Sequence, residues 1–113
     1  MSGKFDYSFY HFRIYTFAFV TQLISIIMPV KNAALFLDEC IDSIISQSYS
    51  NWELLAVNDN SNDDTLQILK RFSALDSRIT VLNNPSNGII EALKTGYNIS
   101  KGEFITRMDA DDI

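Results

Sequence analysis

Short apolar runs alternate with segments of helical periodicity along most of this chain, and this alternation restricts the fold more than any other feature. Four runs rich in apolar and β-branched residues are typical of buried strands: 23–28, 52–57, 79–82 and 104–108. Between them, apolar residues recur at helical spacing, which predicts helices over about 33–47, from 66 to beyond 72, and from 89 to beyond 97. Strands that alternate with helices predict an open, mostly parallel α/β sheet with flanking helices and right-handed crossovers.

The size and composition of the chain allow one domain and exclude several classes of protein. With 113 residues, the chain is shorter than the roughly 150 residues of a typical domain. Hydrophobic residues make up 47% and charged residues 20%, which excludes a disordered, collagen-like or low-complexity chain. The formal net charge of −5 argues against nucleic acid as a partner, because tracking along phosphates requires a basic surface.

The chain divides into an aromatic-rich amino-terminal extension, residues 1–22, and a domain of residues 23–113. The extension contains a crowded set of aromatic residues: Phe5, Tyr7, Phe9, Tyr10, Phe12, Tyr15, Phe17 and Phe19. Charged residues interrupt its apolar run and no small-residue cleavage site follows, so a signal peptide is not favoured. The apolar stretch 14–30 lies at the lower limit for crossing a membrane. We therefore expect the extension to pack on the domain edge, or to touch a membrane or a partner through its aromatic rings.

The single cysteine and the single histidine exclude several kinds of site. Cys40 has no second cysteine for an internal disulfide and no zinc-ligand spacing around it, so we expect a reducing compartment and a core position on the first helix. His11 lies in the extension, which argues against a Ser-His-Asp or Cys-His catalytic unit. Neither G-x-G-x-x-G nor G-x-x-x-x-G-K-[ST] occurs, so the dinucleotide-binding fold and the P-loop lose their main sequence support.

Polar clusters follow each predicted strand, at the point where the strand ends. They occupy residues 29–32, 58–63, 83–88 and 109–112. In an open α/β sheet, ligands bind beyond the carboxyl ends of the strands. We therefore expect these four loops to converge on one edge and to form a binding site there. Because the chain stops just after the last cluster, we also expect it to be the amino-terminal half of a larger sheet, truncated after the fourth strand.

The last cluster suits a divalent cation. Asp109, Asp111 and Asp112 bring three carboxylates together, and two charges 4 Å apart at an effective dielectric of ~20 repel by roughly 4 kcal/mol. Mg²⁺ or Mn²⁺ would neutralise them, since both take oxygen ligands and commonly share them with substrate phosphates. Such triplets also occur in solvated loops. The position of this one among three other polar strand ends favours a metal–diphosphate site.

The cluster after the second strand has a structural and a functional interpretation, and both can hold. Residues 58–61 can form a turn, and Ser61-x-x-Asp64 resembles a capping box for the second helix. Asp59 can accept hydrogen bonds from the imide edge of a base. Asn32 likewise offers an N-cap for the first helix.

From Ile24 to Ile113 the chain resembles the amino-terminal half of a family 2 glycosyltransferase with the GT-A fold. Residues 27–33 resemble the opening P-V-Y-N-A, with Lys31 where tyrosine is usual. Residues 39–49 resemble the first helix and the Q-T-Y that ends it, and 57–63 resemble V-D-D-G-S-T-D, with Asn58 in place of the first aspartate. Residues 101–112 are similar to the K-G-E-Y-I and D-x-D segments. Four such segments in order make the resemblance specific.

The resemblance implies transfer of a sugar from a nucleotide diphosphate donor, UDP- or GDP-linked, most often with inversion. By position, Pro29, Val30, Asn32 and Asp59 would bind the nucleoside, with Asp59 at the base. Asp109 would approach the ribose or the metal, and Asp111 would coordinate the Mn²⁺ or Mg²⁺ that bridges the diphosphate and stabilises the leaving group. We expect the departures at Lys31 and Asn58 to change nucleotide preference or affinity and to leave the site in place.

The resemblance also implies that the acceptor-binding half and the general base lie downstream of residue 113. Family members build polysaccharides or glycolipids, often on lipid-linked acceptors at the cytoplasmic face of the membrane, so we expect a cytoplasmic protein that can contact the membrane. Two alternatives stay open. The chain can be a non-catalytic nucleotide-sugar-binding fragment or subunit that needs a partner chain, or a different metal-dependent phosphotransfer or nucleotidyl-transfer enzyme. The sequence identifies neither the sugar nor the acceptor.

Overall fold

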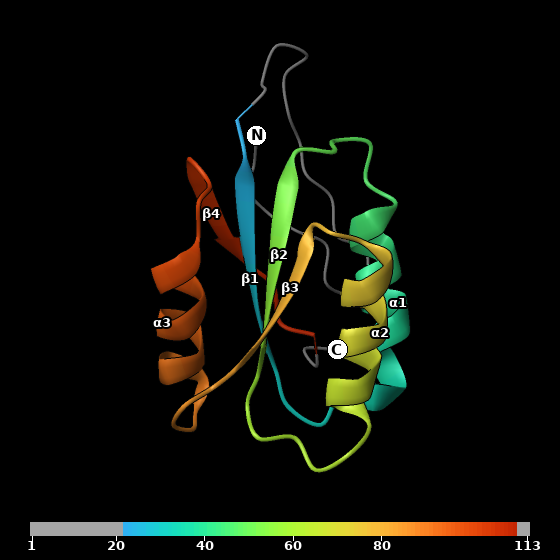
Figure 1. Cartoon of the computed structure of the whole chain (residues 1–113), viewed down its shortest axis with the longest axis vertical. Coiled ribbons are helices and arrows are strands. Elements are labelled where there is room, and N and C mark those ends of the chain that lie inside the picture. Colours follow the sequence, from blue (N-terminus) through green and yellow to red (C-terminus); the bar gives the residue numbers. More distant parts are fainter. Residues whose placement is uncertain (1–21, 111–113) are drawn as a thin grey trace.

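A computed structural model describes residues 22–110, which form a parallel sheet with helices on both faces (Figure 1). The strands are β1 (Ile24–Val30), β2 (Trp52–Asn58), β3 (Ile79–Asn83) and β4 (Phe104–Arg107). The helices are α1 (Ala34–Ile45), α2 (Thr65–Leu75) and α3 (Ile89–Ile99). The strand order is β3-β2-β1-β4 and every pair is parallel. The predicted α/β class and the alternation of elements are confirmed.

The direction of the crossovers explains which helix covers which face. The chain steps from β1 to β2 to β3 through α1 and α2, which cover one face of the sheet (Figure 1). It then returns past β2 and β1 through α3, which covers the other face. When all crossovers have the same hand, a crossover that moves along the sheet in one direction and a crossover that moves in the other direction must lie on opposite faces of the sheet. The strand order therefore reverses between β1 and β4, which is where open α/β sheets bind ligands.

The core lies between the sheet and helices α1 and α2. Ile26, Met28, Leu54 and other strand residues are fully buried, and the apolar face of α1 is buried against them: Leu37, Cys40, Ile41 and Ile44. Cys40 contacts Met28, with 3.8 Å between the two sulfur atoms. Burial raises the pKa of the Cys40 thiol to about 12, because a thiolate would lose its hydration there. The predicted core position of Cys40 is confirmed.

The sequence pattern predicts that Pro29 ends the first strand, but β1 continues through Pro29 to Val30. The carbonyl of Ile27 accepts a hydrogen bond from the Met108 N–H on the β4 side, at 3.0 Å. Backbone groups alternate along a strand, so the Pro29 nitrogen faces the same side, beyond the last β1–β4 pair, Ile27 with Arg107. A proline there removes no ladder hydrogen bond, and the strand tolerates it.

The segment that leads into β4 is fixed by close backbone contacts. The Gly102 N–H donates to Ser25 Oγ (2.8 Å), and the Lys101 N–H donates to Glu53 Oε2 (2.7 Å). A Cβ at Gly102 would lie 2.6 Å from both the backbone nitrogen and the Oγ of Ser25. The K-G-E segment therefore joins the start of β4 to β1 and β2.

The predicted extension, residues 1–22, lies outside the described part of the chain except for Gln22. Among the helices that the structure describes, none combines the length and the apolar character needed to cross a membrane.

Candidate functional site

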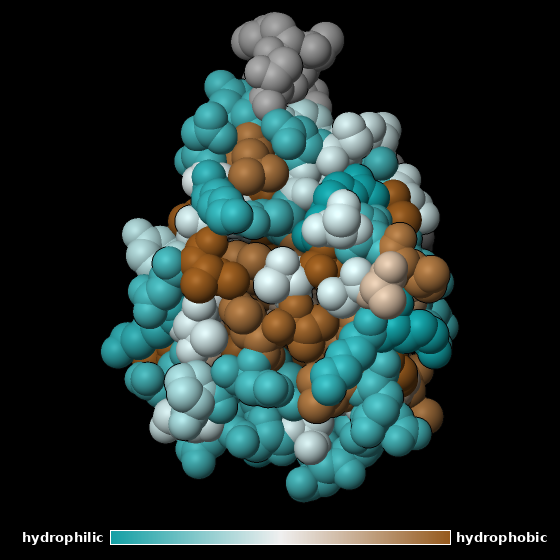
Figure 2. Space-filling view, viewed as in Figure 1, coloured by the Kyte–Doolittle hydropathy of each residue, from teal (hydrophilic) through white to brown (hydrophobic). Residues whose placement is uncertain are grey.

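The polar loops converge at the carboxyl edge of the sheet, as predicted, and enclose a pocket there. The pocket has a volume of about 190 Å³ and lies where the strand order reverses. Its lining comes from the ends of three strands and the first turn of α3: Pro29, Val30, Lys31, Asp59, Ile89 and Asp109. Figure 2 shows that this end of the molecule, at the bottom of the view, is mainly hydrophilic, whereas hydrophobic residues gather in the middle. Four predicted site residues, Pro29, Val30, Asp59 and Asp109, thus line one pocket.

Asp59 is buried at the end of β2, with only 7% of its surface exposed, and holds the β3–α3 loop. Its Oδ1 accepts hydrogen bonds from Asn84 Nδ2 (3.0 Å), the Gly88 N–H (3.1 Å) and Asn60 Nδ2 (3.2 Å). Its Oδ2 accepts only the Gly88 N–H, at 3.2 Å, among the contacts of the described residues. Gly88 has φ of 95°, a conformation that favours glycine. Oδ1 is therefore saturated, and Oδ2 retains capacity to accept a further donor.

Asn84 is a buried member of this site that the sequence pattern did not single out. Its Nδ2 donates both to Asp59 Oδ1 and to the carbonyl of Gly88 (3.1 Å), and its Oδ1 accepts the Ser86 N–H (3.1 Å). The only sequence signal is the turn-rich run 83–88, which predicts a loop without indicating which side chain turns inward. Asn84 therefore joins the β3–α3 loop to Asp59, which lines the pocket.

Asn32 does not cap α1, so that prediction is wrong. The N-cap residue of α1 is Ala33, and it makes no side-chain cap hydrogen bond. The Ala33 N–H donates to Thr65 Oγ1 (2.9 Å) and the Ala34 N–H to Asp63 Oδ2 (3.2 Å). Asn32 instead adopts a left-handed φ of 50° and accepts the Asn62 N–H on its Oδ1 at 2.7 Å. Asn32 lies next to the pocket but outside its lining, and it joins the β1–α1 loop to the β2–α2 loop.

The predicted capping box of α2 is also absent. The N-cap is Asp64 and not Ser61, and Asp64 makes no side-chain cap bond. Ser61 Oγ accepts the Asn32 N–H (3.0 Å). Asp63 Oδ1 accepts the Thr65 N–H at 2.9 Å. Hydrogen bonds from the Thr65 side chain, and then from the Thr65 and Ala34 backbone, hold the pKa of Asp63 below its usual range. The β2–α2 segment therefore supplies the side-chain partners for the start of α1, and the two loops are also joined to each other through Asn32, Ser61 and Asn62.

Asn58, the departure from the V-D-D-G-S-T-D pattern, joins two strand ends. Its Nδ2 donates to Asn83 Oδ1 and its Oδ1 accepts the Ser61 N–H, both at 3.3 Å. The side chain is buried and does not line the pocket. The amide is a donor and an acceptor at once, and both functions are used within the protein.

Asp109 lines the pocket from the segment that follows β4 and is bound by Arg107. Arg107 Nε donates to Asp109 Oδ1 (2.9 Å) and a second guanidinium nitrogen to Oδ2 (3.0 Å). Asp111, the predicted metal ligand, is outside the described residues. Within residues 22–110, no group of three His, Cys, Asp or Glu could enclose a cation. One or two carboxylates completed by substrate phosphates are nevertheless the usual environment of Mg²⁺, so the oxygen donor at this wall fits such an ion.

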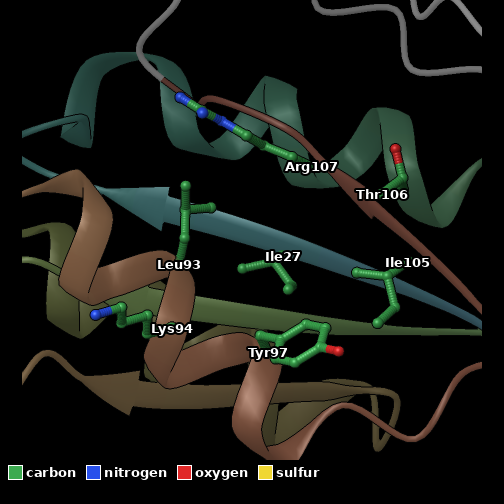
Figure 3. Close-up of a pocket in the computed structure, with 7 residues that line it drawn as sticks. All are labelled: Ile27, Leu93, Lys94, Tyr97, Ile105, Thr106 and Arg107. Atoms are coloured by element: carbon green, nitrogen blue, oxygen red, sulfur yellow. The ribbon is translucent and has the colours of Figure 1, made fainter.

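A second hollow lies between α3 and β4 and differs in character (Figure 3). It has a volume of about 390 Å³, and its walls are mainly apolar: Ile27, Leu93, Lys94, Tyr97, Ile105, Thr106 and Arg107. No carboxylate lines it. The first pocket, with its two carboxylates at the strand ends, is the better candidate for a polar ligand.

The sequence matches the family model described as glycosyl transferase family 2 over residues 25–113. It is 45% identical over 92 residues to an uncharacterized glycosyltransferase of Haemophilus influenzae, covering 80% of this chain and 28% of that protein. It is 42% identical over 92 residues to the Escherichia coli UDP-Glc:alpha-D-GlcNAc-diphosphoundecaprenol beta-1,3-glucosyltransferase WfgD, covering 80% of this chain and 36% of that protein.

Solved structures give the same assignment. The mannosyltransferase PcManGT from Pyrobaculum calidifontis, in complex with GDP-Man and Mn²⁺, aligns with a TM-score of 0.76 and 26% identity over 82% of this chain and 28% of its own. Staphylococcus aureus TarS 1–349 in complex with UDP aligns with a TM-score of 0.71 and 26% identity over 78% of this chain and 27% of its own. The chain thus spans about a third or less of each of these proteins. It belongs to glycosyl transferase family 2 and has the α/β fold of the GT-A glycosyltransferases.

Proposed function

We propose that the pocket at the carboxyl edge binds the nucleoside diphosphate of a UDP- or GDP-linked sugar donor for inverting glycosyl transfer. The observation that carries the proposal is the pocket itself, which has Asp59 on one wall and Asp109 on the other at the point where strand order reverses. The ligands of two structural neighbours, UDP for TarS and GDP-Man with Mn²⁺ for PcManGT, agree with it.

Asp59 is the candidate residue for recognising the base by a hydrogen bond. Its Oδ1 is occupied by three donors, and its Oδ2 has one long contact with Gly88. Uracil and guanine each carry a ring N–H beside a carbonyl, so each offers a donor to Oδ2. Cytosine lacks that ring N–H. Its exocyclic amino group can donate to a carboxylate, but the unprotonated ring nitrogen beside that group repels the carboxylate. Asp59 therefore favours UDP or GDP over CDP, while Pro29 and Val30 form the wall beside the nucleoside.

Asp109, with Asp111, is the candidate for the ribose and the cation. A Mn²⁺ or Mg²⁺ held by these carboxylates and the diphosphate oxygens would supply Lewis-acid stabilisation of the charge on the departing nucleotide. The carboxylates would bind and orient the donor. Asn32 contributes by fixing the β1–α1 loop through Asn62 and Ser61.

The remaining parts of the reaction are assigned to the longer protein. Asp59 and Asp109 are both engaged in hydrogen bonds, so neither suits the general base, which we place downstream of residue 113. The relatives WfgD of Escherichia coli and the chondroitin synthase of Pasteurella multocida, 31% identical over 90 residues, agree with a role in glycolipid or polysaccharide synthesis. We place the protein in the cytoplasm, with contact to the membrane face through residues 1–22.

Thermal unfolding with and without nucleotide tests this proposal. A ligand at about 100 times its Kd adds ~2.7 kcal/mol, and each kcal/mol raises the midpoint of a small domain by roughly 4–8 °C. UDP or GDP with Mn²⁺ should therefore raise the midpoint by about 10–20 °C, and CDP with Mn²⁺ should raise it much less. An unfolding midpoint that no nucleoside diphosphate changes would contradict the proposal.

A non-catalytic, nucleotide-sugar-binding subunit is the second candidate function, because the chain covers 28% of its relative in Haemophilus influenzae. Nucleotide binding is common to both candidates. Transfer of sugar that appears only when a second polypeptide co-purifies with this chain would favour the subunit.

A further inference from the structure

Arg107 and Asp109 connect the two hollows of the molecule. Arg107 is the last residue of β4 and lines the apolar hollow, whereas Asp109 lines the nucleotide pocket. Residues two apart in an extended chain lie on the same side, and here the side chains meet through two hydrogen bonds of 2.9 and 3.0 Å. Asp109 is 25% exposed and Arg107 45% exposed. The pair is therefore partly shielded from solvent.

The surroundings of Arg107 fix the direction of its head group. Figure 3 shows its stem beside the apolar hollow, with the guanidinium pointing away from Ile105 and Tyr97. An arginine stem can cover apolar surface while its charged head stays with a polar partner. A planar guanidinium that makes two parallel bonds to a carboxylate sets the orientation of that carboxylate as well as its distance.

This geometry determines which lone pairs of Asp109 remain available. A carboxylate has about four acceptor positions, and the guanidinium occupies one on each oxygen. The other two face away from Arg107. Without the arginine, the side chain of Asp109 would sample several rotamers, and ordering it on ligand binding would cost affinity.

We propose that Arg107 is a positioning residue for the sugar nucleotide: it holds the Asp109 carboxylate so that its remaining lone pairs accept a ribose hydroxyl in the pocket. The inference rests on the proposed function and deepens it, since it assigns a role to a residue that does not itself line the nucleotide pocket. Arg107 acts through Asp109 and not by attracting the phosphates.

Titration of the full chain with uridine and with UDP, in EDTA, separates these two modes of action. Arg107→Met should weaken the binding of both ligands by about three- to tenfold, which corresponds to the cost of ordering one side chain. Arg107→Lys should resemble Arg107→Met, because an ammonium cannot make two parallel bonds. In an Asp109→Asn background, Arg107→Met should cause no further loss. Guanosine and GDP replace uridine and UDP if the chain prefers guanine.

Arg71→Met is the matched control. Arg71 also pairs with an aspartate, Asp38, but on the outer surface of α1 and α2, where the side chains are 55% and 57% exposed. Its replacement should leave both affinities unchanged. If Arg107→Met weakened the binding of UDP but not that of uridine, Arg107 would act by attracting phosphate. If Arg107→Lys bound both ligands as tightly as the wild-type chain, charge alone would matter. Either result overturns the inference.

A ligand-free measurement keeps the inference separate from the proposed function. Side-chain scalar couplings of Asp109 should report one χ1 rotamer in the wild-type chain and rotamer averaging in both Arg107 variants. Averaged couplings in the wild-type chain would overturn the positioning role even if nucleotide binds. Failure of the wild-type chain to bind any nucleoside diphosphate would instead contradict the proposed function.

Discussion

Replacing Gly102 with alanine should destabilise the domain strongly, because the added methyl group has no space. Its Cβ would lie 2.6 Å from the Ser25 nitrogen and 2.8 Å from the Leu23 carbonyl oxygen. Both are backbone atoms at the start of β1, so the clash is relieved only if β4 moves away from β1. That movement breaks the bond from Gly102 N–H to Ser25 Oγ and the charge-assisted bond from Lys101 N–H to Glu53.

The magnitude follows from the bonds that are lost. A neutral hydrogen bond contributes about 0.5–1.5 kcal/mol and one to a charged group about 1.5–3 kcal/mol, so Gly102→Ala should cost roughly 2–4 kcal/mol. Domains of this kind are stable by only about 5–15 kcal/mol. Denaturant unfolding can be followed through the fluorescence of Trp52, the single tryptophan, which is 1% exposed in the folded state.

Gly88→Ala provides the comparison, since nothing lies within 4 Å of a Cβ there and only the φ of 95° opposes the change. With ψ of 160° this backbone lies in a region that essentially only glycine adopts, so the change should cost about 1–3 kcal/mol through backbone strain alone. Ser25→Gly added to Gly102→Ala removes the hydroxyl clash but not the backbone clash, so it should recover little. A Gly102→Ala chain within about 1 kcal/mol of wild type would refute the close approach of β4 to β1.

Three further predictions concern single side chains. Asp59→Asn should weaken the binding of UDP or GDP by about 10- to 100-fold and reduce the discrimination against CDP, because an amide can donate where the carboxylate only accepts. Asp64→Asn makes the same charge change at the exposed far end of the same β2–α2 loop and should leave calorimetric affinities unchanged. The hydrogen bond from Arg78 lowers the pKa of Asp76 from 3.8, so its stabilisation is complete above the unfolded pKa and is lost as pH falls through the lower, folded value. Asp76→Asn should therefore flatten the acid limb of a plot of unfolding free energy against pH, and an unchanged limb would contradict this assignment. Cys40, with its pKa raised to about 12 by burial, should react with a thiol reagent only at the rate at which the domain opens, as shown by equal rates of labelling and unfolding.

The elements of the fold could be predicted because they depend on local patterns. Apolar runs and helical spacings lie in the sequence itself, and strands and helices appear where these patterns predict them. The prediction that Pro29 ends β1 is wrong because a proline breaks a strand only where its nitrogen should donate a ladder hydrogen bond. The Pro29 nitrogen faces the β4 side beyond the point where β4 stops pairing, and this cannot be seen in the sequence.

The site could be predicted in part, for a related reason. Pro29, Val30, Asp59 and Asp109 follow from their positions at strand ends, and all four line the pocket. Partners from distant segments could not be predicted: Asn84 on Asp59, or Ser61 on the backbone of Asn32. A capping residue is expected to serve its own helix, whereas here the N–H groups at the start of α1 bond to side chains at and just before the start of α2.

The dependence of the start of α1 on side chains at the start of α2 has a consequence for the folding of the chain. The first N–H groups of α1 bond to Thr65 and Asp63, about thirty positions further along the sequence. The start of α1 therefore gains its full stability only after β2 is paired and the β2–α2 loop has arrived. Amide exchange should accordingly report Ala33, Ala34 and Asn62 as one cooperative unit that opens together, although these residues lie in different elements.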